Sequence, residues 1–281
     1  MPIVLEHVSH TYMPGSVMAQ TALSDISLRV EEGEFLGIIG HTGSGKSTLI
    51  QHMNGLMQPS SGRVLVDGFD LSDRKQRIQA RSRVGLVFQY PEYQLFEETV
   101  FKDVAFGPKN LGVSEQEIPA RVEEALLLVG LAPDIFAEKS PFDLSGGEKR
   151  RAALAGIIAM RPRYLLLDEP MAGLDPRGRR AVIDLLQNLR EKTGCAIVMV
   201  SHSMDDVSKY ADRIAVLRKG ELVRADTPER VFSNPESLIE IGLDIPQAAR
   251  LAVELRKRGV NAPAGLYLEE DVGNYLLAAL N

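Results

Sequence analysis

Residues 35–52 read FLGIIGHTGSGKSTLIQH: an apolar run, a glycine-rich turn and the start of a helical pattern. The turn, Gly40–Thr48, fits G-x-x-x-x-G-K-[ST] in the strand–turn–helix context that this motif requires. Glycines let backbone N–H groups turn inward around a chain of phosphates, and the helix N-terminus adds partial positive charge. If the lysine followed a glycine-rich turn only by chance, we would not expect a strand directly before the turn and a helix directly after it. The stretch therefore predicts a nucleotide-phosphate site on a β-strand–loop–α-helix unit.

The side chains of this turn have expected roles. Lys46 would neutralise the β- and γ-phosphate oxygens, and the hydroxyl of Ser47 would bind the accompanying Mg²⁺. The predicted cofactors are therefore ATP and Mg²⁺. The residues of the turn that we expect to contact them are Gly40, His41, Thr42, Gly43, Ser44, Gly45, Lys46, Ser47 and Thr48.

A second apolar run, Tyr164–Leu167, ends in two acids, Asp168 and Glu169. A strand that ends beside a nucleotide needs a carboxylate for Mg²⁺, and Asp168 is expected to be that metal ligand. Glu169 would then orient or deprotonate the attacking water. An acidic N-cap before a loop would explain one of these acids but hardly both.

The order of the elements indicates the fold class. Runs at Phe35–Ile39, Tyr164–Leu167 and Ala196–Val200 read as strands covered on both faces. Ile3–Val8 and Ile26–Val30 alternate apolar and polar residues, as half-buried antiparallel strands do. Helices are expected at Lys46–Leu56, Glu115–Val129, Gly147–Met160 and Pro176–Glu191. The alternation predicts an α/β fold with a mainly parallel sheet and an N-terminal antiparallel β portion.

Two segments depart from this alternation. Residues from about 72 to 141 are mostly helical and loop-like, and we expect them to form an inserted helical lobe within a nucleotide-binding domain of residues 1–233. Residues 234–281 read as a C-terminal extension of short amphipathic helices with Pro and Gly breaks. Its helices are expected at Pro235–Ile241, Pro246–Gly259 and Glu269–Leu280. Their apolar faces predict a module that associates with another subunit.

Composition excludes several classes of protein. The chain has 281 residues, a formal net charge of −6 and a pI near 5.5, whereas a nucleic-acid binder would carry a basic surplus. Aromatic residues make up 6% with no Trp, which disfavours aromatic-lined sugar or RNA surfaces. The N-terminus lacks the pattern of a signal peptide, and no apolar run approaches the ~18–20 residues of a membrane helix. The single cysteine, Cys195, lies in an apolar run and is expected to be a buried, inert thiol in a reducing cytoplasm.

A second glycine motif is Leu144-Ser145-Gly146-Gly147-Glu148. Ser145 and Glu148 form an S-x-x-E capping box, so the simplest interpretation is a helix start. A capping box does not require two glycines, however. Gly146 and Gly147 remove side chains at a helix N-terminus and so predict a second surface that can approach a phosphate closely.

With this motif the chain resembles the ABC ATPase family over nearly all of residues 3–232. In that family the glycine motif of one subunit, here Ser145, Gly146 and Gly147, closes on the nucleotide bound by another. Gly173-Leu174-Asp175 stands at the family's D-loop, so the resemblance makes Asp175 a nucleotide contact. Met171 departs from the threonine of many members, at a position that contacts no phosphate in the family.

The same resemblance implies three further site residues. Gln89 ends the run VGLVF at the family's Q-loop, which implies roles in catalysis and as a Mg²⁺ ligand. His202 follows the run AIVMVS at the position of the switch histidine, which senses the γ-phosphate, although a lone histidine is more often structural. Tyr12 stands where the family stacks an aromatic ring on adenine, and nearby His10 is a rival for that role.

A longer string narrows the resemblance. Gln89–Val100, QYPEYQLFEETV, followed by DVAFGP at 103–108, is similar to the ATP-binding A-component of energy-coupling-factor transporters, importers of vitamins and of cobalt or nickel. This implies a membrane T-component that docks near Tyr90–Pro108, a substrate-binding S-component reached indirectly, and a peripheral place on the cytoplasmic face of the cell membrane. The aromatic residues of the string could instead form only the core of the lobe. Glu148, in place of a commoner glutamine, resembles one member of a pair of different A-components, and a homodimer stays open.

Three other functions compete. The ATPase of another ABC transport system would have the same chemistry but not the QYPEYQLFEETV string. An ABC ATPase that acts on nucleic acid usually carries long coiled coils or a second cassette, and neither is present in this sequence. A P-loop kinase for small molecules would leave the second glycine surface, Gln89 and His202 unexplained. We therefore predict an ATP-hydrolysing subunit that powers an importer through ATP-driven closure of a dimer.

Overall fold

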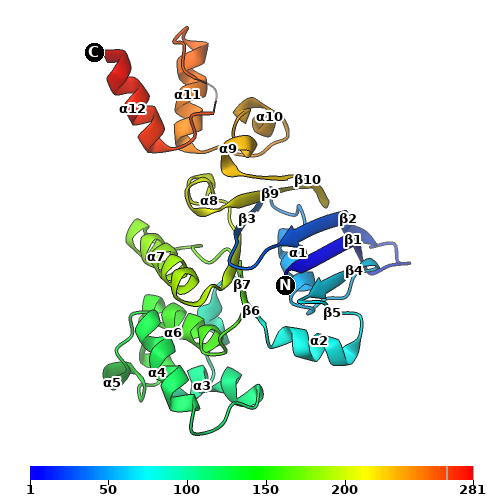
Figure 1. Ribbon diagram of the computed structural model, residues 1–281, viewed down its shortest axis with the longest axis vertical. Helices are drawn as coiled ribbons and strands as arrows, with labels where there is room; N and C mark the ends of the chain where they lie inside the picture. The colour runs from blue at the N-terminus through cyan, green and yellow to red at the C-terminus, as the bar shows by residue number, and fades with distance from the viewer. Residues whose placement is uncertain (264, 281) are drawn as a thin grey trace.

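The computed structural model describes residues 1–263 and 265–280 and contains two β-sheets with helices around them (Figure 1). One sheet has four strands and the other has six. Helical layers occupy the two ends of the long axis, with α3–α6 at one end and α10–α12 at the other (Figure 1). The α/β fold class predicted from the sequence is confirmed.

The six-stranded sheet has the order β10-β9-β3-β8-β7-β6. Its strands are β3 (Phe35–Gly40), β6 (Val84–Val87), β7 (Tyr164–Asp168), β8 (Ala196–Val200), β9 (Arg213–Arg218) and β10 (Glu221–Asp226). The pairs from β9 to β6 are parallel, and β10 is antiparallel to β9 at the edge. Every residue of β3, β6, β7 and β8 is buried, because helices or the second sheet cover both faces. The parallel direction brings the carboxyl ends of β3, β7 and β8 to one edge.

The second sheet is antiparallel, with the order β2-β1-β4-β5. It comprises β1 (Ile3–Tyr12), β2 (Gln20–Val30), β4 (Ser61–Val66) and β5 (Phe69–Asp70). The first two strands are longer than predicted, since pairing continues as far as Tyr12 opposite Gln20. Helix α1 (Lys46–Met53) packs against β2 and β4 of this sheet and against β3 and β7 of the other. The phosphate-loop helix is therefore held by both sheets.

The helical lobe differs in extent from the predicted 72–141. Helix α2 (Arg74–Arg81) packs on β5 and β6, outside the lobe, and β6 is an integral strand of the main sheet. The lobe consists of η1 (Pro91–Gln94), α3 (Val100–Asn110), α4 (Ile118–Leu128), α5 (Pro133–Phe136), η2 (Pro141–Asp143) and α6 (Gly146–Ile158). Helix α6 belongs to it because its apolar residues pack with α3 and α4. The lobe thus runs continuously from Pro91 to Ile158, through and beyond residue 141.

The remaining helices are α7 (Pro176–Thr193), α8 (Met204–Tyr210), α9 (Pro228–Val231), α10 (Pro235–Glu240), α11 (Gln247–Lys257) and α12 (Glu269–Leu280). Buried residues of α10 and α11, such as Leu238 and Val253, join the same apolar core as Phe232 and the central sheet. The C-terminal helices are therefore packed onto the cassette rather than joined to it by a free linker. Ala264 and Asn281, which fall within the predicted extension, lie outside the described residues.

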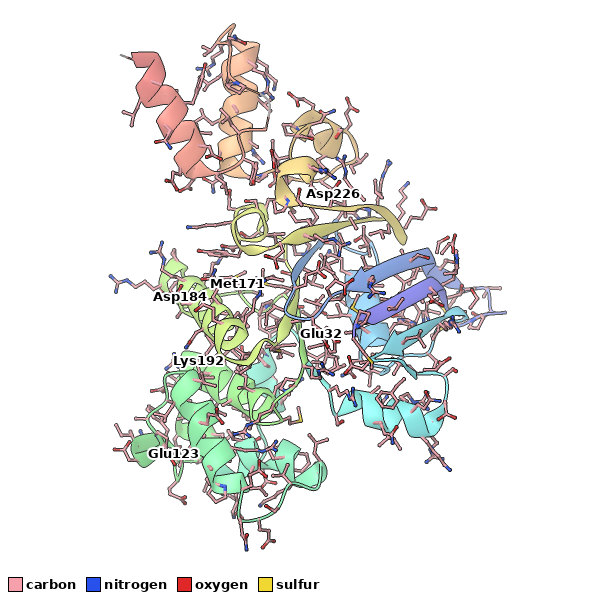
Figure 2. The ribbon with its side chains drawn as sticks, viewed as in Figure 1. Glu32, Glu123, Met171, Asp184, Lys192 and Asp226 are labelled. Carbon is pink, nitrogen blue, oxygen red and sulfur yellow. The ribbon has the colours of Figure 1, made fainter. Side chains whose placement is uncertain are left out.

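Two single residues complete the core. Cys195 is buried, and burial raises the pKa of its thiol to about 12, as an inert thiol requires. Met171 is also buried, and Figure 2 places it in the interior near α7. None of the described helices combines the length and the apolar character that a membrane crossing demands.

Candidate functional site

The glycine-rich turn joins the carboxyl end of β3 to the N-terminus of α1, as the motif predicts. Gly45 has φ of 102°, and a Cβ there would lie 2.5 Å from the carbonyl oxygen of Ala22. A Cβ on Gly40 would lie 2.4 Å from the carbonyl oxygen of Leu217. Both distances are shorter than real Cβ contacts, so the backbone can follow this path only as glycine. The result is a loop of backbone N–H groups ahead of a helix N-terminus, which suits an anion.

Two polar side chains of this loop, Lys46 and Ser44, are suited to bind an anion. Nζ of Lys46 donates to the carbonyl oxygens of Gly40 at 2.8 Å and His41 at 3.1 Å, which holds the ammonium inside the turn. Burial lowers the pKa of Lys46, and the carboxylates of Glu169 and Asp168 oppose that shift. The hydroxyl of Ser44 is buried and has no hydrogen-bond partner among the described residues. An ammonium and an unused hydroxyl in a turn of N–H groups fit a phosphate chain.

Asp168 lies at the carboxyl end of β7, two strands from the loop in the sheet. Its carboxylate accepts a hydrogen bond from the hydroxyl of Ser47, the second residue of α1. Burial raises the pKa of Asp168, and this hydrogen bond and the charge of Lys46 hold it down. A carboxylate next to a hydroxyl at the phosphate loop is the oxygen pair that Mg²⁺ takes in P-loop proteins. The predicted metal ligands Ser47 and Asp168 are thus adjacent.

Glu169 follows directly and has a left-handed backbone, with φ of 51°. Such a conformation costs a non-glycine residue of order 1–3 kcal/mol. Burial raises the pKa of Glu169 to about 7, and Lys46 and the backbone N–H of His202 oppose the rise. Oε1 of Glu169 is buried without a hydrogen bond from the described residues. A carboxylate with a pKa near neutrality and a free oxygen is suited to accept a proton from water.

His202 lies beyond the end of β8, so the parallel sheet brings it to Glu169. Nε2 of His202 is 3.1 Å from Oε1 of Glu169, within ion-pair distance but not oriented as a hydrogen bond. The imidazole is half exposed, and burial together with the charge of Lys46 lowers its pKa. The ring is therefore neutral at pH 7 and faces the same space as the acid. Lys46, Ser47, Asp168, Glu169 and His202 form one site.

Tyr12 stands beside the phosphate loop at the end of β1. Its hydroxyl is 2.9 Å from Oγ1 of Thr48, a residue of the loop. Its ring is 38% exposed and packs edge-on against His10, with the centroids 4.7 Å apart. His10 is buried, so of the two candidates only Tyr12 offers an open ring face.

The second glycine surface is on α6. Ser145 caps this helix: its hydroxyl accepts from the N–H of Glu148, whose carboxylate accepts from the N–H of Ser145 in return. A Cβ on Gly146 would meet nothing within 4 Å, so this helix end is open. Figure 1 shows α6 in the lobe and α1 beside the antiparallel sheet, in different parts of the molecule. One chain therefore does not bring its two glycine surfaces to the same phosphate.

Gln89 and Asp175 occupy the edges of the site. Gln89 lies two residues beyond the end of β6 and is exposed. Asp175 caps α7, where its carboxylate accepts the N–H of Gly178 at 2.7 Å, and it is also exposed. Neither has a contact with Lys46 or Asp168 among the described residues.

Arg150, in α6, is a residue that the sequence analysis did not single out. Its Nε and Nη2 each donate at 3.0 Å to the carboxylate of Glu92, and its Nη1 donates to the carbonyl oxygens of Ala172 at 2.9 Å and Pro170 at 3.4 Å. The side chain is 6% exposed. It thus joins the lobe to the loop that follows Glu169. Its place inside an otherwise apolar helix face, one turn after the capping box, is the available sequence signal.

Comparison with known proteins agrees with this geometry. The family model described as "ABC transporter" matches residues 23–172. The chain is 51% identical over 281 residues to the energy-coupling factor transporter ATP-binding protein EcfA2 of Caldanaerobacter subterraneus subsp. tengcongensis, covering 100% of this chain and 98% of that one. It is 57% identical over 264 residues to EcfA2 of Symbiobacterium thermophilum, covering 94% and 91%.

Two solved structures have the same fold. CbiO1 from Clostridium perfringens, described as part of the ABC transporter complex cbiONQ, has a TM-score of 0.74 and 37% identity, with 89% of this chain and 97% of that chain covered. The cassette MJ0796, solved as a dimer bound to ADP and phosphate, has a TM-score of 0.71 and 31% identity, with 80% and 98% covered.

Proposed function

The chain belongs to the ABC transporter family and, within it, to the energy-coupling-factor ATP-binding proteins, and we propose that it hydrolyses ATP to power an importer of small nutrients such as vitamins or transition-metal ions. The observation that carries the proposal is the site of Lys46, Asp168, Glu169 and His202 at one edge of the parallel sheet. Family membership implies nucleotide binding. Placing Mg²⁺ on Ser47, Asp168 and Gln89 is our proposal, and the ion would neutralise charge on the phosphates.

The roles of the residues follow from their environments. Backbone N–H groups of Gly40–Thr48 and the ammonium of Lys46 bind the phosphates. Glu169, with its pKa near 7 and its unpaired Oε1, takes a proton from the attacking water. His202 adds a neutral imidazole that can donate a hydrogen bond toward the γ-phosphate. Tyr12 stacks on the base.

We propose that the complete site needs a second ATPase subunit, identical or paralogous. The helix end at Ser145–Gly147 is open and exposed, and Asp175 is exposed at the start of α7. Both are therefore free to meet the nucleotide of a partner. Exposed apolar side chains on the C-terminal helices, Ile239 and Leu251, are suited to hold the two subunits together, as a subunit-association module over residues 234–281 would.

The membrane partner is expected at a groove in the lobe. A cavity of about 360 Å³ lies between α3 and α6 and is lined by Leu95, Phe96, Phe106 and small residues of α6. The rings of Phe96 and Phe106 meet edge-on at 4.9 Å, and they are 56% and 44% exposed. The carboxylate of Asp103 accepts the backbone N–H groups of Phe96 and Glu97 and so fixes the rim. An exposed aromatic pair beside a preformed groove fits a helix of the T-component.

The test is Phe96→Glu. We expect the isolated protein to stay folded and to bind ATP, because Phe96 is already half exposed and touches no phosphate ligand. Burying an unpaired carboxylate against an apolar helix costs several kcal/mol, so the variant should lose the membrane subunit on co-purification. Leu127→Glu, at an exposed apolar position of α4 outside the groove, is the matched control and should retain it. Assembly and transport at the normal level in Phe96→Glu would place the docking surface elsewhere.

A further inference from the structure

Two buried histidines lie near Tyr12, and the first of them, His10, packs against its ring. His52 is on α1 and is fully buried, and His10 is on β1 and is 9% exposed. Nε2 of His52 is 3.2 Å from Nδ1 of His10, with the ring centroids 4.8 Å apart. None of the phosphate or water chemistry above uses either ring.

The neighbours of the pair determine where its protons are. Nδ1 of His52 is 2.7 Å from the carbonyl oxygen of Thr48. A carbonyl only accepts, so Nδ1 of His52 carries the proton and its Nε2 is an acceptor. Nδ1 of His10 faces that acceptor and the carbonyl oxygen of Gln58 at 3.2 Å, so it must carry a proton as well. The hydrogen bonds therefore place a proton on Nδ1 of each imidazole.

These contacts form a closed ring of four residues, which we call the circuit: His52, Thr48, Tyr12 and His10. His52 donates to the carbonyl oxygen of Thr48, and the side chain of Thr48 bonds the hydroxyl of Tyr12. Tyr12 packs edge-on against His10, which donates back to His52. The circuit links β1, which ends in the adenine-contacting ring, to α1, which begins with the phosphate-binding lysine. Tyr12 is fixed at two points, its hydroxyl and its ring edge.

We propose that His10 and His52 are positioning residues for nucleotide binding, which hold Tyr12 at a fixed place relative to the phosphate loop. This role rests on the proposed contact between Tyr12 and adenine. A ring that is held in place before binding loses less conformational freedom when the base stacks on it. The pair should thus strengthen the binding of the base without affecting that of the phosphates.

The arrangement also predicts a dependence on pH. A second proton on Nε2 of His52 would face the N–H of His10 and would break the circuit. The groups that surround the pair are the ring of Tyr12 and the carbonyls of Thr48 and Gln58, and among the described residues no carboxylate or lysine contacts either imidazole. Burial lowers the pKa of His52 below its ordinary 6.5, so the circuit is complete at neutral pH and weakens only as the pH falls toward that lowered pKa. Acid should therefore loosen Tyr12.

The experiment compares the binding of ADP and of inorganic pyrophosphate to the full chain by calorimetry. His52→Phe keeps an aromatic ring of similar size but removes both hydrogen bonds. We expect its affinity for ADP to fall about threefold to tenfold at pH 7.5, the effect of one or two hydrogen bonds, with pyrophosphate unchanged. As the pH is lowered from 7.5, the ratio of the ADP affinity to the pyrophosphate affinity should fall more in the original protein than in the variant, because protonation of the two ligands is common to both proteins. His7→Gln, an exposed histidine on the same strand, is the control and should match the original protein.

Several outcomes separate this role from the adenine contact itself. If Tyr12→Ala weakens ADP but His52→Phe does not, Tyr12 binds the base and the histidine pair does not position it. If Tyr12→Ala leaves ADP unchanged, the adenine contact fails and the positioning role fails with it. Equal losses for ADP and pyrophosphate in His52→Phe would show a damaged phosphate loop instead. Should His52→Phe fail to fold, Tyr12→Phe removes the hydroxyl contacts with Thr48 and Met57 but keeps the ring, and normal ADP affinity in that variant would overturn the proposal.

Discussion

Arg150→Gln should destabilise the protein and slow hydrolysis together. The guanidinium makes four hydrogen bonds, two to Glu92 and one each to the carbonyl oxygens of Pro170 and Ala172. A glutamine can replace at most one of them, and Glu92 would be left mostly buried without its partner. Removing one member of a buried pair costs about 3–5 kcal/mol, and we expect the lower end, about 3 kcal/mol, because Glu92 is 18% exposed.

The kinetic effect has a separate cause. Pro170 directly follows Glu169, so losing its anchor would free the carboxylate that we propose as the base to move. A displacement of about 1 Å costs on the order of 10²-fold in rate, and we expect kcat to fall ten- to a hundredfold. KM for ATP should hardly change, because Arg150 touches no phosphate-binding residue.

Urea unfolding and steady-state ATPase assays measure the two effects. Arg161→Gln is the control, since it breaks the exposed pair with Glu124 in the same lobe and should cost less than about 1 kcal/mol. The reasoning is refuted if Arg150→Gln changes the unfolding free energy no more than the control and leaves kcat intact. A fall in kcat without loss of stability would separate the kinetic role from the structural one.

Three further predictions concern the site and the C-terminal helices. Glu169→Gln should bind ATP but not hydrolyse it. In the original protein kcat/KM should rise with pH through about 7, because only the deprotonated carboxylate can act as base. A flat pH profile would show that another group is the base. Lys46→Ala should weaken nucleotide binding at least tenfold by calorimetry, because the phosphates lose their main cation, and an unchanged affinity would contradict the phosphate-loop assignment. Leu251→Glu should weaken the association of ATPase subunits in sedimentation without lowering the melting temperature, since Leu251 is 45% exposed; unaltered association would exclude its face from the interface.

The sequence predicts best those parts of the site that are contiguous in the chain. Gly40–Thr48 supplies loop, cation and hydroxyl in nine successive residues, so one pattern contains the whole phosphate cradle. The acids Asp168 and Glu169 are equally visible, because an apolar strand precedes them. Their proximity to Ser47 and His202 could be predicted from the rule that parallel strands end at one edge of the sheet.

The sequence did not predict side-chain contacts between segments that are far apart in the chain. Arg150 and Glu92 are 58 residues apart, and His10 and His52 are 42 apart. Apolar periodicity predicts that a helix face is buried but does not show what covers it. For that reason the C-terminal helices were foreseen, whereas their shared core with Phe232 was not. Packing likewise shows that α6 joins α3 and α4, which the residue pattern around 141 does not indicate.

The geometry of one chain also explains why binding and hydrolysis should be separable. Lys46 and Asp168 are already bonded to the loop and to Ser47, so the proposed phosphate and metal positions are formed within a single subunit. Oε1 of Glu169, by contrast, is buried and accepts no hydrogen bond from the described residues, which is a costly state for a carboxylate oxygen. The open helix end at Gly146 that could enclose the reacting phosphate belongs to a different part of the molecule. A single subunit should therefore bind ATP at full strength, and turnover should rise steeply with protein concentration until the two subunits pair.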